Sequence, residues 1–71
     1  MKEVYVFKTS AKTARQIHDA TQLLNSLKSI QRIDFDPEDC DNILRIESTL
    51  QISREIIELL NLNGFFCEEL N

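Results

Sequence analysis

Residues 35–46, FDPEDCDNILRI, decide the fold of this chain. Apolar residues alternate with polar ones on both sides of its acidic middle, first at Ile33 and Phe35 and then at Leu44 and Ile46. Alternation with a period of two is typical of a strand. The residues between the two runs are Pro, Asp, Glu and Asn, which favour turns. The stretch therefore predicts a β-hairpin in the middle of the chain.

The residues before the hairpin predict a strand and then a helix. Residues 2–9, KEVYVFKT, are rich in β-forming residues, and both faces of that strand are apolar, so either Val4 and Val6 or Tyr5 and Phe7 are the buried pair. Residues 11–28 place apolar side chains three and four positions apart, which is typical of an amphipathic helix. Ser10 is the expected N-cap of this helix, with Thr9 and Thr13 as alternatives.

The residues after the hairpin predict a second helix and a last strand. The helix is expected over residues 51–62, with Ser48 or Thr49 as its N-cap. Asn63-Gly64 ends it, because glycine adopts the left-handed conformation at the end of a helix without strain. Residues 65–70 then form the last strand.

The predicted order of elements is β-α-β-β-α-β, in a single domain over residues 1–71. Right-handed crossovers and short connections lead to an α+β, ferredoxin-like fold. It has a four-stranded antiparallel sheet, in the order 4-1-3-2, with two helices on one face. In this topology the loop after the first strand, the 36–42 hairpin and the 61–64 turn lie at the same end of the sheet.

With this order of elements, the chain resembles a heavy-metal-associated (HMA) domain over nearly its full length. The resemblance rests on the aliphatic stripe of the first helix, on Ile30 leading into a strand, and on Asn63-Gly64-Phe65 entering the last strand. In that family a glycine–aromatic pair commonly stands at this last position. The resemblance implies a small domain of the kind found in copper chaperones and in the N-terminal modules of metal-transporting ATPases.

The metal-binding motif of that family is absent from this chain. The family holds a soft metal ion with Met-x-Cys-x-x-Cys between the first strand and the first helix, and the corresponding residues 8–14 are KTSAKTA. The cysteine positions fall on Ser10 and Thr13 in one register and on Ala11 and Ala14 in the other. Neither register supplies a thiolate, which is the ligand that Cu(I) and Zn(II) prefer. We therefore expect a degenerate metal site and no bound cofactor.

Other metal ligands are only weak candidates. Cys40 and the single histidine, His18, could contribute to an atypical site, whereas Cys67 is expected in the core, on the other side of the sheet from Cys40. The acidic run that begins at Asp34 starts like a calcium-binding loop. It then places Asp39 where that loop needs glycine and Arg45 where it needs glutamate.

The net charge argues against nucleic acid and anionic membrane as partners. The net charge is -4, with residues 1–32 carrying a balance of +4 and residues 33–71 a balance of -8. No stretch is long and apolar enough to span a membrane. The expected interaction surface combines the charged end of the sheet with the open sheet face. It consists of Lys8, Lys12, Arg15, Asp36, Glu38, Asp39 and Asp41, together with Tyr5 and Phe7.

The sequence shows no catalytic constellation, so we expect a protein that is not an enzyme. No serine or cysteine stands in a recognisable nucleophile arrangement with histidine, and the chain has a single glycine, too few for a phosphate-binding loop.

The N-terminus does not resemble a secretory signal, which favours the cytoplasm. The leading hypothesis is a non-enzymatic interaction or regulatory module that binds a protein partner or itself. One alternative is an atypical metal-binding protein with displaced ligands, and a second is a dimeric small-molecule-sensing domain.

Overall fold

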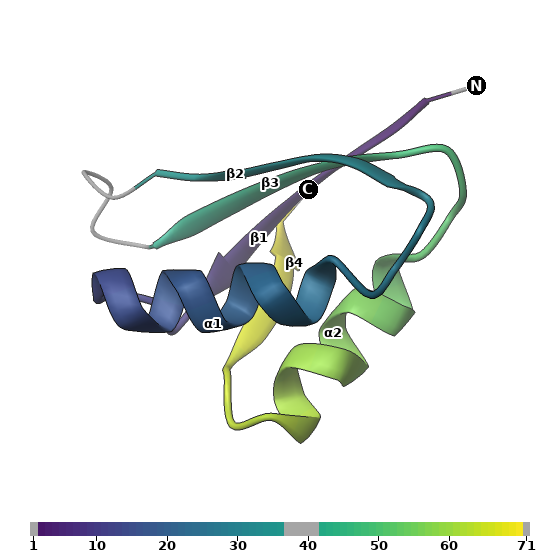
Figure 1. Ribbon diagram of the computed structural model, residues 1–71. Coiled ribbons are helices and arrows are strands. Elements are labelled where there is room, and N and C mark those ends of the chain that lie inside the picture. The colour runs from purple at the N-terminus through teal and green to yellow at the C-terminus, as the bar shows by residue number, and fades with distance from the viewer. Residues whose placement is uncertain (1, 37–41, 71) are drawn as a thin grey trace.

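The sheet has four strands in the order β2-β3-β1-β4, which is the predicted order read from the other edge. The computed structural model describes residues 2–36 and 42–70. Its elements are β1 (Glu3–Thr9), α1 (Ala14–Leu24), β2 (Ile30–Phe35), β3 (Ile43–Ser48), α2 (Ser53–Leu62) and β4 (Cys67–Leu70). All neighbouring strands are antiparallel, and both helices cover the same face of the sheet (Figure 1). The predicted ferredoxin-like fold is confirmed.

The core lies between the sheet and the two helices. α1 contributes Ala20 and Leu24, and α2 contributes Ile56 and Leu60, all of them at most 1% exposed. The spacing of these residues by four within each helix places them on one face, as the sequence pattern predicted. Cys67, at the start of β4, is also buried, which confirms its predicted place in the core.

The register of β1 settles which of its two apolar faces is buried. Tyr5 lies opposite Ile46 and Phe7 opposite Leu44, on the helix side of the sheet, and Phe7 is fully buried. Val4, on the other face, is 61% exposed. The prediction that Tyr5 and Phe7 belong to an exposed interaction surface is therefore wrong. Since the helices cover only one sheet face, the larger aromatic side chains fill the core and the valines face solvent.

The helix starts differ from the sequence prediction. α1 begins at Ala14 after the N-cap Thr13, which was an alternative to Ser10. α2 begins at Ser53, and its N-cap position is Ile52, which makes no side-chain capping hydrogen bond. Ser48 and Thr49 were the wrong choice for this cap. Ser48 is the last residue of β3, and its buried hydroxyl donates to the Leu50 carbonyl at 2.9 Å instead.

The turn after α2 has the left-handed glycine that the sequence predicted at the end of this helix. Gly64 has a φ of +87°, in the left-handed region, and its N–H donates to the Asn61 carbonyl at 3.1 Å. The N–H of Phe65 donates to the Leu60 carbonyl at 2.9 Å, which closes the end of the helix and directs the chain into β4. Within the described residues, neither helix is long and apolar enough to cross a membrane.

Candidate functional site

The loop between β1 and α1 is built on the hydroxyl of Thr9. This side chain is buried, and its hydroxyl donates to the carbonyl of Asn42 at 2.9 Å while its oxygen accepts from the N–H of Ala11 at 3.2 Å. Asn42 stands just before β3 and has a φ of +52°, a conformation that asparagine tolerates better than most residues. Thr9 therefore ties the start of the loop to the end of the central hairpin.

Ser10 ties the same loop to the approach of β4. Its N–H donates to the Phe66 carbonyl at 3.2 Å, and the Phe66 N–H donates back to the Ser10 hydroxyl oxygen at 2.9 Å. We predicted that the loop after the first strand lies at the same end of the sheet as the 36–42 hairpin and the 61–64 turn. The contacts of the loop with Asn42, at the end of that hairpin, and with Phe66, just after that turn, agree with this placement. Phe66 itself is 53% exposed beside the loop.

Thr13 closes the loop with a capping box. Its hydroxyl oxygen accepts from the Gln16 N–H at 3.1 Å, and the Gln16 side-chain oxygen accepts from the N–H groups of Thr13 and Lys12, both at 3.0 Å. These bonds satisfy N–H groups that the start of a helix otherwise leaves without partners. The hydroxyls of Thr9, Ser10 and Thr13 are thus all used to hold the loop in one conformation.

The candidate metal ligands do not come together in the described residues. Among residues 2–36 and 42–70 there is no group of three or more His, Cys, Asp or Glu side chains that could hold a metal ion. His18 is exposed on α1. Burial, followed by the nearby Glu69 carboxylate, raises the pKa of the Cys67 thiol to about 12, so it is protonated at neutral pH. Cys40 lies outside the described residues.

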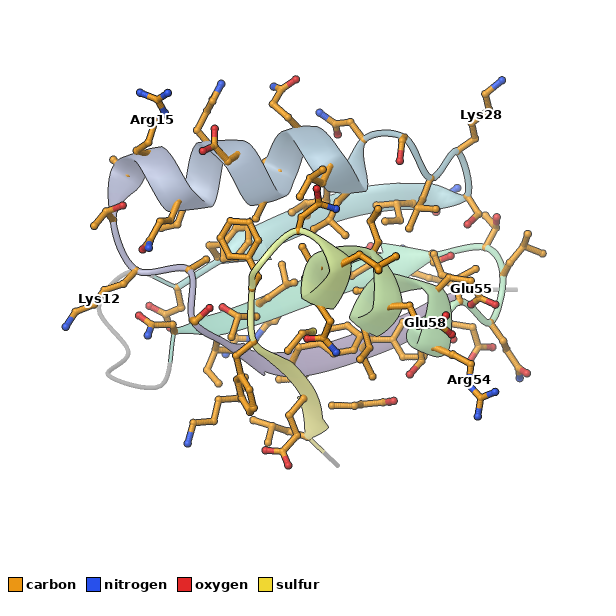
Figure 2. The ribbon with its side chains drawn as sticks, turned by 90° about the horizontal axis from the view of Figure 1, so that it is seen from below. Lys12, Arg15, Lys28, Arg54, Glu55 and Glu58 are labelled. Carbon is orange, nitrogen blue, oxygen red and sulfur yellow. The ribbon has the colours of Figure 1, made fainter. Side chains whose placement is uncertain are left out.

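The positive residues of the predicted interaction surface are exposed. Lys12 lies in the loop and Arg15 in the first turn of α1, and both point away from the molecule (Figure 2). Arg15 also pairs with Asp19 one turn later, at 3.7 Å. Lys8 is exposed on the open face of β1, next in the sequence to the buried Thr9.

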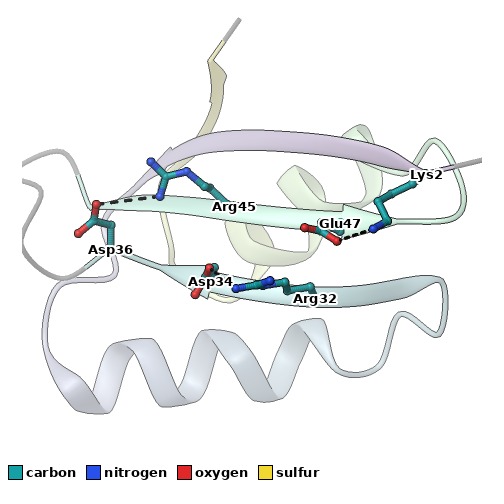
Figure 3. Close-up of polar contacts among 6 residues, drawn as sticks. All are labelled: Lys2, Arg32, Asp34, Asp36, Arg45 and Glu47. Carbon is teal, nitrogen blue, oxygen red and sulfur yellow. Dashed lines mark hydrogen bonds and ion pairs between the residues drawn. The ribbon is translucent and has the colours of Figure 1, made fainter.

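Of the predicted acidic residues, Asp36 is the one that the structure describes. Its carboxylate lies 4.0 Å from the Arg45 guanidinium of β3 (Figure 3). Glu38, Asp39 and Asp41 lie outside the described residues.

Sequence reasoning missed two features of this region. The first is the exchange of hydrogen bonds between Ser10 and Phe66, which no local pattern predicts, because the two residues are 56 positions apart. The second is the pattern of charges on the open sheet face. The signal for the second feature is present in the sequence, since opposite charges stand two positions apart at Arg32 and Asp34 and again at Arg45 and Glu47.

Comparison with known proteins gives structural matches alone. No protein-family profile matches the chain, and no curated protein matches it by sequence. The N-terminal domain of ZntA in the Zn(II)-form matches with a TM-score of 0.80 and 13% identity, over 93% of this chain and 89% of that one. Oxidized MerP from Ralstonia metallidurans CH34 matches with a TM-score of 0.82 and 4% identity, over the full length of both chains.

A third match is the apo form of the HMA domain of the copper chaperone for superoxide dismutase. Its TM-score is 0.75 and its identity 19%, over 100% of this chain and 69% of that one. At such identities the likeness concerns the fold alone. This chain shares its ferredoxin-like fold with these solved structures, one of which is named as an HMA domain.

Proposed function

We propose that this chain is a non-enzymatic binding module with an HMA-type fold and a degenerate metal site, which acts in the cytoplasm on a protein partner. The observation that carries the proposal is the chemistry of the β1–α1 loop. Where the resemblance places two thiolates, this chain has hydroxyl and methyl groups, and the hydroxyls of Ser10 and Thr13 already take part in hydrogen bonds within the protein.

The loop is chemically unsuited to a soft metal ion. Hydroxyl oxygens are poor ligands for Cu(I) and Zn(II), which prefer sulfur and imidazole nitrogen. A metal at Ser10 or Thr13 would also compete for the oxygens that hold the loop to Phe66 and to Gln16. The positive charge of Lys12 opposes a cation there as well.

The same end of the molecule has a surface suited to an acidic protein partner. Lys8, Lys12 and Arg15 present three positive charges around the loop, in a chain whose net charge is -4. Phe66, which is 53% exposed, adds an apolar contact next to Ser10. Exposed charges of one sign steer the encounter with a partner of the opposite sign, and a neighbouring aromatic residue supplies contact area.

The metal half of the proposal is tested by native mass spectrometry with Zn(II) and Cu(I). We expect no stoichiometric metal adduct with the wild type. Ser10→Cys/Thr13→Cys is the positive control, because it returns two thiols to exposed positions of the loop; it should bind one metal ion. A one-metal adduct of the wild type that Cys40→Ser abolishes would contradict the proposal and favour displaced ligands.

The partner half is tested by quantitative capture from a cell extract. Lys12→Glu/Arg15→Glu reverses the charge at the loop, and Lys28→Glu/Arg54→Glu makes the same change in net charge at the distant positions seen in Figure 2. We expect the first variant to lose the proteins that the wild type retains and the second to keep them. Equal retention by both variants would show that the loop end is not the docking surface.

A further inference from the structure

The face of the sheet that the helices leave open carries charges in an ordered array. In one row across the sheet, Arg32 of β2 lies opposite Glu47 of β3. In the next row, Asp34 of β2 lies opposite Arg45 of β3. Positive and negative residues thus alternate along both strands and across them, which makes a two-by-two charge checkerboard (Figure 3).

Apolar residues continue the same two rows on the other side of β3. Val4 of β1 lies opposite Glu47, and Val6 lies opposite Arg45. Leu70 of β4 extends the second row beyond Val6. Val4 is 61% and Leu70 38% exposed, so the checkerboard is bordered by an apolar strip that faces solvent.

This arrangement is complementary to itself under a two-fold rotation. We propose that the open sheet face binds a second copy of this chain, about a two-fold axis that runs across the strands midway between the two rows. The rotation places Arg32 against Asp34 of the second copy and Arg45 against Glu47 of the second copy. It also places Val4 against Val6 of the second copy. Each of these three opposed pairs is then either oppositely charged or apolar on both sides.

The balance of charge supports a second copy over an acidic or basic partner. Among residues 2–36 and 42–70, the open face carries four positive residues, Lys2, Lys8, Arg32 and Arg45, and four negative residues, Asp34, Asp36, Glu47 and Glu68. The chain as a whole has a net charge of -4, so two copies repel one another except where their surfaces are locally neutral. The open face is such a surface.

The existing ion pairs on this face do not oppose the association. Lys2 and Glu47 lie 3.1 Å apart, and Arg32 and Asp34 3.3 Å apart, with side chains between 30% and 65% exposed. Exposed pairs of this kind stabilise a protein little, so exchanging partners across an interface costs little. The checkerboard residues and Val4 also line a shallow hollow of about 250 Å³, which side chains of the opposing copy can enter.

The size of the face sets the expected strength of the dimer. The whole molecule measures 31 × 22 × 17 Å, so one sheet face is smaller than the roughly 800 Å² per partner of a standard stable interface. We therefore expect a weak dimer, with a Kd on the order of 0.1 mM that rises with salt concentration.

Charge complementation between two variants tests the proposal. Arg45→Glu sets negative charge against Glu47 of the second copy, and Glu47→Arg sets positive charge against Arg45 of the second copy. By sedimentation equilibrium each variant alone should raise the dimer Kd about tenfold or more. An equimolar mixture should restore the affinity of the wild type, since residues 45 and 47 are again oppositely charged across the axis. A dimer with its two-fold axis parallel to the strands would not show this restoration, because residue 45 would then not face residue 47 of the second copy.

Matched controls make the same charge changes on the outer face of α2. Arg54→Glu and Glu58→Arg should dimerise like the wild type, because both residues are exposed on the opposite side of the molecule (Figure 2).

A wild type that stays monomeric up to about 1 mM would overturn the proposal. So would a mixture of the two sheet variants that fails to associate while circular dichroism shows both folded. If either variant unfolds, the amide chemical shifts of the wild type test the proposal instead. They must change with protein concentration for residues of the open face.

Discussion

The hydroxyl residues of the β1–α1 loop have a structural role in this chain. Thr9 is buried, and its side chain satisfies one N–H and one carbonyl group at the same time. A buried polar group that lacks its partner costs more than a hydrogen bond contributes, so such a residue is hard to replace. The loop therefore depends on these hydroxyls for its shape. In this shape the hydroxyl oxygens of Ser10 and Thr13 accept hydrogen bonds from backbone N–H groups of the protein.

Thr9→Val should measure this role, since it keeps the shape of the side chain and removes the hydroxyl. It leaves the Ala11 N–H without its partner and removes the bond to Asn42, so we expect a loss of about 1–3 kcal/mol in the free energy of unfolding. Thr49→Val is the matched control, because Thr49 is exposed and its hydroxyl contacts the Ser29 carbonyl at a long 3.5 Å. Urea denaturation of both variants provides the comparison. Equal losses would contradict the assigned role.

The buried thiol of Cys67 should make stability depend on alkaline pH. Burial raises its pKa in the folded protein from 9.0 to about 12, so between these values the folded protein keeps a proton that the unfolded chain releases. The free energy of unfolding must therefore fall as pH rises through this range, by up to roughly 1.4 kcal/mol per pH unit from this group. Urea denaturation between pH 8 and 11 should show a shallower fall for Cys67→Ala than for the wild type. Identical slopes would mean that the thiol is not buried.

At the scale of elements, the helix caps show where sequence patterns are ambiguous. Three hydroxyl residues, Thr9, Ser10 and Thr13, were each possible N-caps of the first helix, and the structure selects Thr13 because Gln16 completes its capping box. The other two bond to segments distant in sequence, Asn42 and Phe66. A local pattern carries no information about such partners, so the sequence predicted the helix but not its first residue.

Thr13→Ala should destabilise α1 by about 1 kcal/mol, because it removes the oxygen that accepts from the Gln16 N–H. Gln16→Ala removes the reciprocal bonds to Thr13 and Lys12. Because the two side chains form one capping box, the double variant should lose less than the two single variants together. Thermal unfolding followed by circular dichroism gives the four values. Strict additivity would indicate that the two caps act independently.

At the scale of the whole molecule, the topology was predictable because the element order and short connections allow few arrangements. The sequence did not predict which face of β1 is buried, because the pair Val4 and Val6 is as apolar as the pair Tyr5 and Phe7. Packing decides it: Phe7 lies fully buried against the helices, and Val4 is left in solvent. The charge checkerboard could not be recognised either, because it exists only once the register sets Arg32 against Glu47 and Asp34 against Arg45.

We propose that the HMA-type fold of this chain works without a metal ion in its β1–α1 loop. The most direct measurement is a titration of isotope-labelled protein with Zn(II) and then Cu(I), followed through the backbone amide signals of residues 10–16. We predict that these signals do not move beyond the effect of ionic strength, while those of Ser10→Cys/Thr13→Cys shift until one equivalent is bound. Saturating shifts in the loop of the wild type at one equivalent would contradict the account.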